Sequence, residues 1–142
     1  MSSKLKDIKE KILQLLERLA SESDKGTPII VEGQNDVEAL RKLAIKGDVI
    51  AAKASGRSLL DVLREVQKRG IREVVLLMDF DRRGKEWTKR LAQNLERMRI
   101  KANLLFWNEL LNLVGHDLKD IEGLPTYMET LRKKCGDQSS KV

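Results

Sequence analysis

Apolar residues occur along this chain in two alternating patterns. Short, mainly apolar runs at 29–32, 48–52, 73–78 and 102–107 predict strands that are buried on both faces. Between these runs, apolar residues recur every three or four positions, which predicts helices that bury one face. The expected order is one helix, then four strands with a helix after each of the first three, and then further helices.

Strands that alternate with helices at this spacing imply parallel strands joined by right-handed crossovers. We therefore expect an α/β fold with a four-stranded, mainly parallel sheet flanked by helices. In a doubly wound sheet of the flavodoxin-like order, the first and third strands are neighbours, and ligands bind beyond their carboxyl ends. Polar residues that follow these two strands are thus the first candidates for a functional site.

Local signals suggest where several helices begin and end. We expect the helix after the first strand to begin at Asp36 and to have Gly47 as its C′ residue. Ser58 and the acid three residues later resemble a capping box. The helix after the third strand is expected from about Lys85 to Arg99, which leaves 79–84 as a loop.

The 142 residues are most economically one domain, long enough to bury a core. Residues 1–27 form an amphipathic N-terminal helix and a linker, 28–108 the core, 109–134 the C-terminal helices and 135–142 a polar tail. Thr126 and the glutamate three residues later fit a second capping box. The apolar stripe of the N-terminal helix must cover the flank of the sheet or another subunit. A homodimer or a protein partner through this helix therefore stays open.

Composition narrows the classes of partner. Of the residues, 35% are charged and the net charge is +6, which favours anionic partners, nucleic acid first. The alternative is an ordinary solvated surface. The chain has a single cysteine, Cys135, which excludes a disulfide within the chain. Its single histidine is His116, so the two residues cannot form a zinc cluster of Cys and His ligands. No apolar stretch approaches the roughly 20 residues of a membrane span. We therefore expect a cytoplasmic protein.

Three acids lie at the ends of the two strands that should be neighbours. Glu32 ends the first strand, and Asp79 and Asp81 follow the third. Two carboxylates about 4 Å apart repel by roughly 4 kcal/mol at an effective dielectric near 20. A divalent ion relieves this repulsion, and Mg²⁺ is typically bound by one or two carboxylates and by substrate phosphates. We therefore expect Mg²⁺ or Mn²⁺ at these acids. The alternative is that the aspartates only pair with Arg82 and Arg83.

Several residues that flank these acids in the sequence are candidates to shape or support the acidic site. Gly33 and Gly84 permit tight turns or a close approach by a phosphate backbone. Phe80, between the two aspartates, is expected to point into the core. Asp36 either caps the helix that follows the first strand or supports Glu32.

Two stretches resemble the signatures of the Toprim domain family. They are Val31-Glu32-Gly33-Gln34-Asn35-Asp36 and Asp79-Phe80-Asp81-Arg82-Arg83-Gly84. The loop Ala54-Ser55-Gly56-Arg57-Ser58 resembles the small-residue turn between these signatures in primases and small Toprim proteins. The resemblance covers about Pro28 to Trp107. The family includes type IA and II topoisomerases, DnaG-type primases, OLD-family nucleases, RecR proteins and the nuclease that matures bacterial 5S ribosomal RNA.

The resemblance implies a Rossmann-like Toprim fold and a Mg²⁺-dependent site for cutting, joining or polymerising phosphodiesters. By position, Glu32 matches the family glutamate proposed as general acid/base, and Asp79 and Asp81 match the metal-binding aspartates. Arg83 stands where topoisomerase-type domains often carry a third aspartate. Asp117 lies in a segment that resembles the acidic segment following the domain in primases, which makes it a candidate supporting residue of the site. No catalytic tyrosine domain or zinc module accompanies the motifs, so a topoisomerase or a complete primase is not indicated.

Five basic residues belong to segments expected near the same edge of the sheet, where they could bind phosphates. They are Lys53, Arg57, Arg82, Arg83 and Lys85. The alternative for each of them is a solvated position.

The main hypothesis is a Mg²⁺-dependent, nucleic-acid-binding Toprim protein that acts as a nuclease or a related phosphotransfer enzyme on DNA or RNA. The alternative is a non-catalytic nucleic-acid-binding or assembly subunit that retains the acidic site. A phosphate-accepting receiver-like domain fits less well, because its first strand would need adjacent acids. A dinucleotide site is weaker still, since no Gly-x-Gly-x-x-Gly follows the first strand.

Overall fold

The computed structural model describes residues 2–136, so that most of the predicted polar tail, 137–142, lies outside the described residues. Among the described helices, none combines the length and the apolar character needed to cross a bilayer. The elements in chain order are α1 (Ser2–Asp24), β1 (Ile29–Val31), α2 (Gln34–Lys42), β2 (Val49–Ala51), the 3₁₀ turn η1 (Ala54–Gly56), α3 (Leu59–Lys68), β3 (Glu73–Leu76), α4 (Arg82–Arg97), β4 (Lys101–Asn103), α5 (Leu105–Val114) and α6 (Leu124–Lys134).

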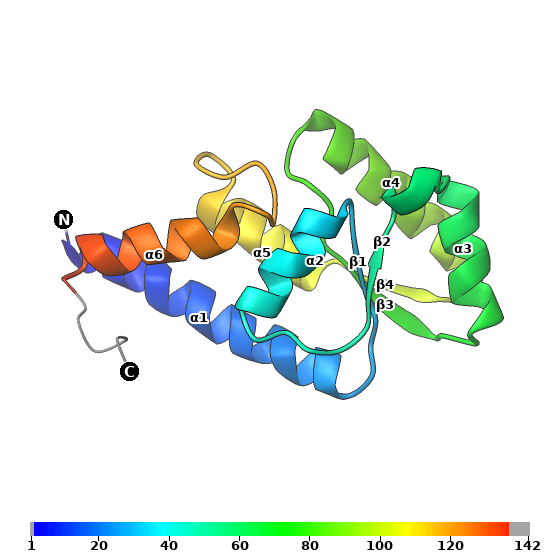
Figure 1. The fold of residues 1–142 in the computed structure, drawn as a ribbon, viewed down its shortest axis with the longest axis horizontal. Helices are drawn as coiled ribbons and strands as arrows, with labels where there is room; N and C mark the ends of the chain where they lie inside the picture. The colour runs from blue at the N-terminus through cyan, green and yellow to red at the C-terminus, as the bar shows by residue number, and fades with distance from the viewer. Residues whose placement is uncertain (1, 137–142) are drawn as a thin grey trace.

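The four strands form one sheet in the order β2-β1-β3-β4, and all pairs are parallel (Figure 1). Ile30 of β1 lies opposite Ile50 of β2 and opposite Leu76 of β3. The prediction of a parallel α/β sheet in which the first and third strands are neighbours is confirmed. The carboxyl ends of β1 and β3 therefore lie side by side.

Side chains of alternating strand residues pack into two hydrophobic cores, one on each face of the sheet. Ile29 and Val31 of β1 pack with residues of α1, α2, α5 and α6. Ile30, between them, packs with residues of α3 and α4 on the opposite face. Burial on both faces explains why the strands are short apolar runs without the polar alternation of a half-exposed sheet.

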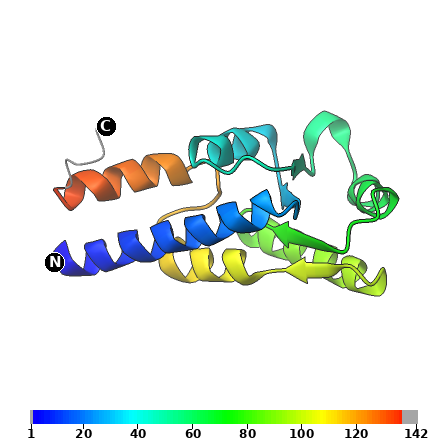
Figure 2. The ribbon, with the colours of Figure 1, turned by 90° about the horizontal axis from the view of Figure 1, so that it is seen from below.

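Helix α1 packs within the chain, between α5 and α6 (Figure 2). Its stripe residues Ile12 and Leu19 are fully buried against the core of one sheet face. Of the two alternatives for this stripe, the structure thus shows the one in which it covers the chain's own core. Leu13, on another side of α1, is 46% exposed. A partner at this helix stays a prediction. The helix also extends to Asp24, so the linker is shorter than the sequence suggested.

The fourth strand was predicted too long. β4 ends at Asn103, and Phe106 and Trp107 belong to α5. The side chain of Asn103 accepts a hydrogen bond from the backbone N–H of Leu105 at 3.0 Å, which turns the chain into the helix. The indole Nε1 of Trp107 donates to the backbone carbonyl of Met78 at 2.9 Å. An apolar run that resembled a strand is therefore a helix packed beneath the end of β3.

The capping predictions had mixed outcomes. Ser58 and Asp61 form the predicted capping box at the start of α3. In contrast, Thr126 lies inside α6, which begins at Leu124, so the second capping box is wrong.

The end of α2 also differs from the prediction. The chain leaves the helix through Ala44, which has φ 67°, and not through Gly47. Gly47 is needed for packing instead, because a Cβ on this residue would lie 2.4 Å from the Oγ of Ser23. At its other end, α2 begins at Gln34, two residues before Asp36.

Candidate metal centre

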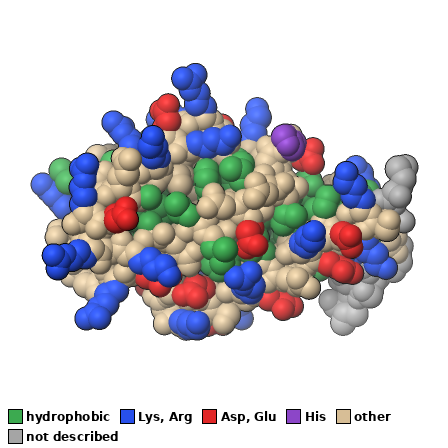
Figure 3. All heavy atoms as spheres, turned by 180° about the vertical axis from the view of Figure 1, so that it is seen from behind, with side chains coloured by type: hydrophobic (Ala, Val, Ile, Leu, Met, Phe, Trp, Pro, Cys, Tyr) green, Lys and Arg blue, Asp and Glu red, His purple; other side chains and the backbone are tan. Residues whose placement is uncertain are grey.

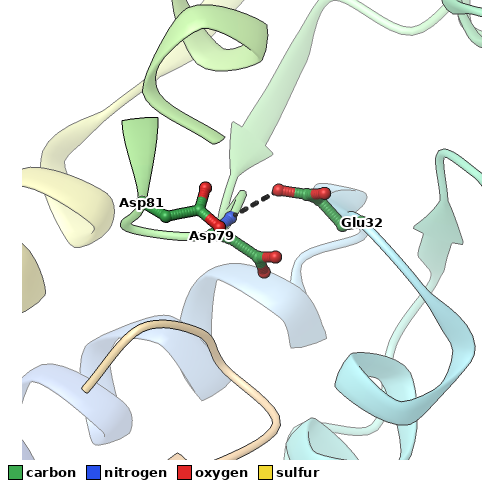
Figure 4. A group of neighbouring side chains, drawn as sticks. All are labelled: Glu32, Asp79 and Asp81. Carbon is green, nitrogen blue, oxygen red and sulfur yellow. Dashed lines mark hydrogen bonds between the residues drawn. The ribbon is translucent and has the colours of Figure 1, made fainter. Parts of the chain in front are cut away.

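Three carboxylates meet beyond the carboxyl ends of β1 and β3. Glu32 follows β1 directly, Asp79 lies in the turn after β3, and Asp81 precedes α4. Each of the three offers a carboxylate oxygen, and these oxygens all lie within 4.8 Å of one another (Figure 4). The parallel pairing of β1 with β3 thus brings together acids that are far apart in the sequence.

Glu32 is buried and is held by two hydrogen-bond donors. Its Oε1 accepts from the Nζ of Lys53 at 2.6 Å, and its Oε2 accepts from the backbone N–H of Asp79 at 3.1 Å. The first contact reaches the loop after β2 and the second reaches the turn after β3. Since a carboxylate has about four lone-pair positions, each oxygen keeps capacity for another ligand.

Asp79 is the least well compensated of the three acids. Burial, and then the nearby negative charge of Glu32, raise the pKa of Asp79 from its ordinary value to about 8. Its Oδ1 is buried and has no hydrogen-bond partner among the described residues. An orphaned carboxylate oxygen with two further carboxylates in reach is an arrangement that a hard divalent cation satisfies. The residues present therefore fit the metal that the sequence implied.

Asp81 has a structural role as well as a place in the acidic cluster. Its Oδ1 accepts from the backbone N–H of Gly84 at 2.7 Å, so Asp81 is the N-cap of α4. Arg82 and Arg83 therefore lie in the first helical turn, which corrects the prediction that 79–84 is a loop. Gly84 allows this helix start, because a Cβ here would lie 2.1 Å from the backbone carbonyl of Asp79.

Asp36 supports the turn that follows Glu32. One of its oxygens accepts from the backbone N–H of Gly33 at 3.0 Å, which caps α2, and the other accepts from the N–H of Glu122 at 2.9 Å. Burial raises the pKa of the Asp36 carboxyl group above its ordinary value. Gly33 itself has an extended backbone with φ −136°, so its position does not require glycine.

The segment after α5 reaches the site, but not through the residue predicted. Asp117 is exposed and accepts a hydrogen bond from the Tyr127 hydroxyl at 3.4 Å. Asp120, in the same segment, is near enough for its negative charge to add slightly to the raised pKa of Asp79. The neighbouring carbonyl of Lys119 accepts from the N–H of Phe80 at 2.6 Å. The acidic run of this segment contains both Asp117 and Asp120, and nothing in the sequence distinguished between them.

The five predicted phosphate-binding residues do not form one group. Lys53 points to Glu32, and its Nζ lies 5.1 Å from the centre of the Trp87 ring. Arg57 pairs with Glu65. Arg82, Arg83 and Lys85 are exposed on the first turn of α4.

The structure explains why a glycine stands at position 56 and a phenylalanine at position 80. Gly56, in the turn before α3, has φ +71°, a left-handed conformation that favours glycine, while nothing would crowd a Cβ there. Phe80 is buried as expected, with its ring centre 6.2 Å from that of Trp107. Phe80 thus fixes the turn between the two aspartates to the core.

Comparison with known proteins agrees with this geometry. The family model described as "Toprim domain" matches residues 27–105. A UPF0292 protein of Methanocaldococcus jannaschii is 39% identical over 84% of this chain and 91% of its own length. Another, from Methanosarcina acetivorans, is 36% identical over 94% of this chain and 92% of its own length. A solved structure of a protein from Aquifex aeolicus superimposes with a TM-score of 0.65 at 28% identity, covering 77% of this chain and 94% of that one. The Toprim match favours that resemblance over the receiver-like and dinucleotide-binding alternatives.

Proposed function

Since this chain belongs to the Toprim domain family and to the UPF0292 proteins, we propose that it is a metal-dependent protein that acts on nucleic-acid phosphodiesters. The acidic centre binds Mg²⁺ or Mn²⁺, and exposed basic residues beside it bind phosphates. The reaction class is hydrolysis or a related phosphoryl transfer. The substrate is DNA or RNA.

The observation that carries the proposal is the orphaned Oδ1 of Asp79, with Glu32 and Asp81 in reach. A divalent ion there would neutralise the cluster and polarise a phosphate oxygen. Asp79 supplies the unsatisfied oxygen, while Asp81 keeps one oxygen that does not cap α4. Glu32 is the candidate general acid/base, because it is the buried carboxylate already fixed by donors from two other loops.

Phosphate binding falls to cations at the edge of this centre. Arg82 is 95% exposed and lies 3.9 Å from Glu86, a weak contact that leaves its guanidinium available. Arg83 and Lys85 are exposed on the same turn. Lys53 is a further candidate, since a phosphate oxygen could replace Glu32 as its partner once a metal ion engages the glutamate.

One observation favours a non-catalytic subunit as the alternative. The ion pair between Lys53 and Glu32 neutralises part of the acidic centre without any metal ion. Such a site could persist for structural reasons while the protein only binds nucleic acid or a partner protein. In this alternative the protein still binds nucleic acid but does not catalyse phosphoryl transfer.

The test uses labelled single-stranded and duplex DNA and RNA with Mg²⁺, with Mn²⁺ or with EDTA. We expect metal-dependent products from the wild-type protein, and a rate at least about 10²-fold lower in Glu32→Gln, since a positioned acid or base contributes about 10²–10⁴-fold. Glu38→Gln is the matched control, because Glu38 is an exposed glutamate on α2. Thermal unfolding of each variant verifies that it is folded.

The outcomes separate the two functions. Nucleic-acid binding without products under any metal condition supports the subunit. Equal activity in Glu32→Gln and the control contradicts the role of Glu32. A protein that neither gains thermal stability with Mg²⁺ or Mn²⁺ nor binds any of the four nucleic acids contradicts the proposal as a whole.

A further inference from the structure

The positive charge of this chain is concentrated in one stretch, residues 82–101. The stretch contains eight Lys or Arg and two Glu, a net charge of +6, which equals the net charge of the whole chain. The other 122 residues contain 20 basic and 20 acidic side chains and are neutral as a set. The basic residues are Arg82, Arg83, Lys85, Lys89, Arg90, Arg97, Arg99 and Lys101.

Six of these cations lie on the outward side of α4, Arg99 lies in the turn that follows it, and Lys101 begins β4. All eight are exposed, whereas Gly84, Thr88, Leu91 and Leu95 form the buried side of the helix. Among the described residues, Arg82 is the one member of the eight with a carboxylate within ion-pair distance. The basic surface is therefore largely uncompensated.

The basic surface begins at the acidic centre. Asp81 caps α4, and Gly84 packs directly against the backbone of Asp79, so the first turn is fixed to the cluster. The helix then runs for 16 residues, about 24 Å at 1.5 Å per residue, back to the start of β4. In Figure 1, α3 and α4 lie at the end of the molecule opposite the chain termini. On that half of the face shown in Figure 3, Lys and Arg side chains outnumber Asp and Glu.

The kind of side chain on this surface favours nucleic acid over an acidic protein as its partner. The exposed positions of α4 hold Lys, Arg, Glu and Gln, with no exposed aliphatic or aromatic residue among them. Protein interfaces are organised around buried apolar or aromatic anchors, which this face lacks. A phosphate backbone needs only a row of cations.

We propose that the outward face of α4 is the surface along which a nucleic-acid backbone lies on its way to the metal centre. This inference rests on the proposed function and extends it from the first turn of α4 to Lys89, Arg90, Arg97 and the residues after the helix. At 3.4 Å of axis per phosphate, about 24 Å of helix spans about seven phosphates of one strand of a duplex. Binding through this face does not depend on base sequence, since it contacts phosphates alone.

The test compares two triple variants of equal charge. Lys89→Gln/Arg90→Gln/Arg97→Gln removes cations from α4 away from the acidic centre. Lys4→Gln/Lys6→Gln/Lys11→Gln removes three exposed cations from α1 as the control. Affinity for labelled DNA and RNA, single-stranded and duplex, is measured against salt concentration in EDTA. We expect the log–log salt slope to become shallower by about 2 to 3 in the α4 variant, at about 0.7–0.9 per phosphate contact. The slope of the control should match wild type.

Two results would overturn the inference while the proposed function stands. One is a wild-type slope in the α4 variant, which would mean that the backbone does not lie on this helix. The other is the same loss in both variants, which would reflect net charge alone. If the wild-type protein binds no nucleic acid, the proposed function fails, and the inference fails with it. Far-ultraviolet circular dichroism of both variants verifies that the helices are intact.

Discussion

Asp79 holds its carboxyl group partly buried and next to Glu32, and both features favour the protonated form. Without a metal ion, a proton on the Asp79 carboxyl group relieves its repulsion with Glu32 and so stabilises the folded state. A divalent ion that replaces this proton would relieve the same repulsion. The acidic centre therefore links stability to both pH and metal.

This linkage predicts how stability changes with pH in EDTA. Because the pKa of Asp79 is about 8 in the folded chain and near its ordinary value in the unfolded chain, the folded state binds the extra proton between these values. The stabilisation is complete below about pH 4 and is lost as pH rises to about 8. We expect the Tm of the wild type to fall between pH 5 and 8.5, and Asp79→Asn to flatten this decline. Thermal unfolding in EDTA measures both.

Added metal provides the control for this prediction. An ion that binds only the folded state stabilises it by mass action, so Mg²⁺ or Mn²⁺ should raise the wild-type Tm most at pH 8, and should not raise that of Asp79→Asn. A wild-type Tm that stays level or rises over this pH range in EDTA would contradict the assignment.

The two motif glycines should differ in how much stability an alanine substitution costs. At Gly84 a Cβ would meet the carbonyl of Asp79 at 2.1 Å, whereas at Gly33 the nearest atom would be 3.9 Å away. Gly84→Ala should destabilise the fold by about 1–3 kcal/mol, the usual cost of overpacking, and should weaken metal binding because Asp79 must shift. Gly33→Ala should cost about 1 kcal/mol or less, the cost of alanine at a helix N-cap. Urea unfolding and the Mg²⁺-dependent Tm shift measure these effects. Equal losses in the two variants would refute the packing argument.

At the scale of elements, the sequence predicted the features that depend on local hydrophobic pattern and on the order of strands and helices along the chain. The placement of the first and third strands as neighbours was correct, because short apolar runs between amphipathic helices have few other packings. The strands themselves end slightly earlier than predicted, β1 at Val31 and β3 at Leu76. The start of α4 was missed, because Arg83-Gly84 resembles a turn unless the contact of Gly84 with Asp79 is known. The extent of β4 was missed for a similar reason, since the hydrogen bond from Trp107 to Met78 is a tertiary contact.

Asp36 shows how one side chain joins two distant elements. Its two oxygens accept from the backbone of Gly33 and of Glu122, and an amide has only one oxygen to offer. Asp36→Asn should leave one of these N–H groups without an acceptor and cost about 1–3 kcal/mol. Urea unfolding measures the loss, and hydrogen exchange at the Gly33 and Glu122 amides locates it. Asp117→Asn, at an exposed aspartate of the same segment, should change neither. Full protection of both amides in Asp36→Asn would contradict the bridging role.

At the scale of the whole molecule, the segments outside the α/β core are part of its structure. Helix α1 buries its stripe against α5 and α6 as well as against the sheet, and the segment after α5 contacts the turns of both motifs. We therefore keep the proposal that the chain is a single domain, with 28–108 as its core. The bounds of this core stay a prediction. The pairing of α1 with α5 and α6 depends on long-range packing that no local pattern records.

The position of α1 between α5 and α6 also has a consequence for the order of events on the ribosome. The apolar side chains of α1 are synthesised about 80 or more residues before the helices α5 and α6 that cover them. At about 5–20 residues per second, the interval is on the order of ten seconds. During that time the emerging chain presents an uncovered amphipathic helix, while its strands are being added one by one. The native fold can close only when α5 and α6 have left the exit tunnel, so the segment after α5 joins the turns around the acidic centre long after α1 has emerged.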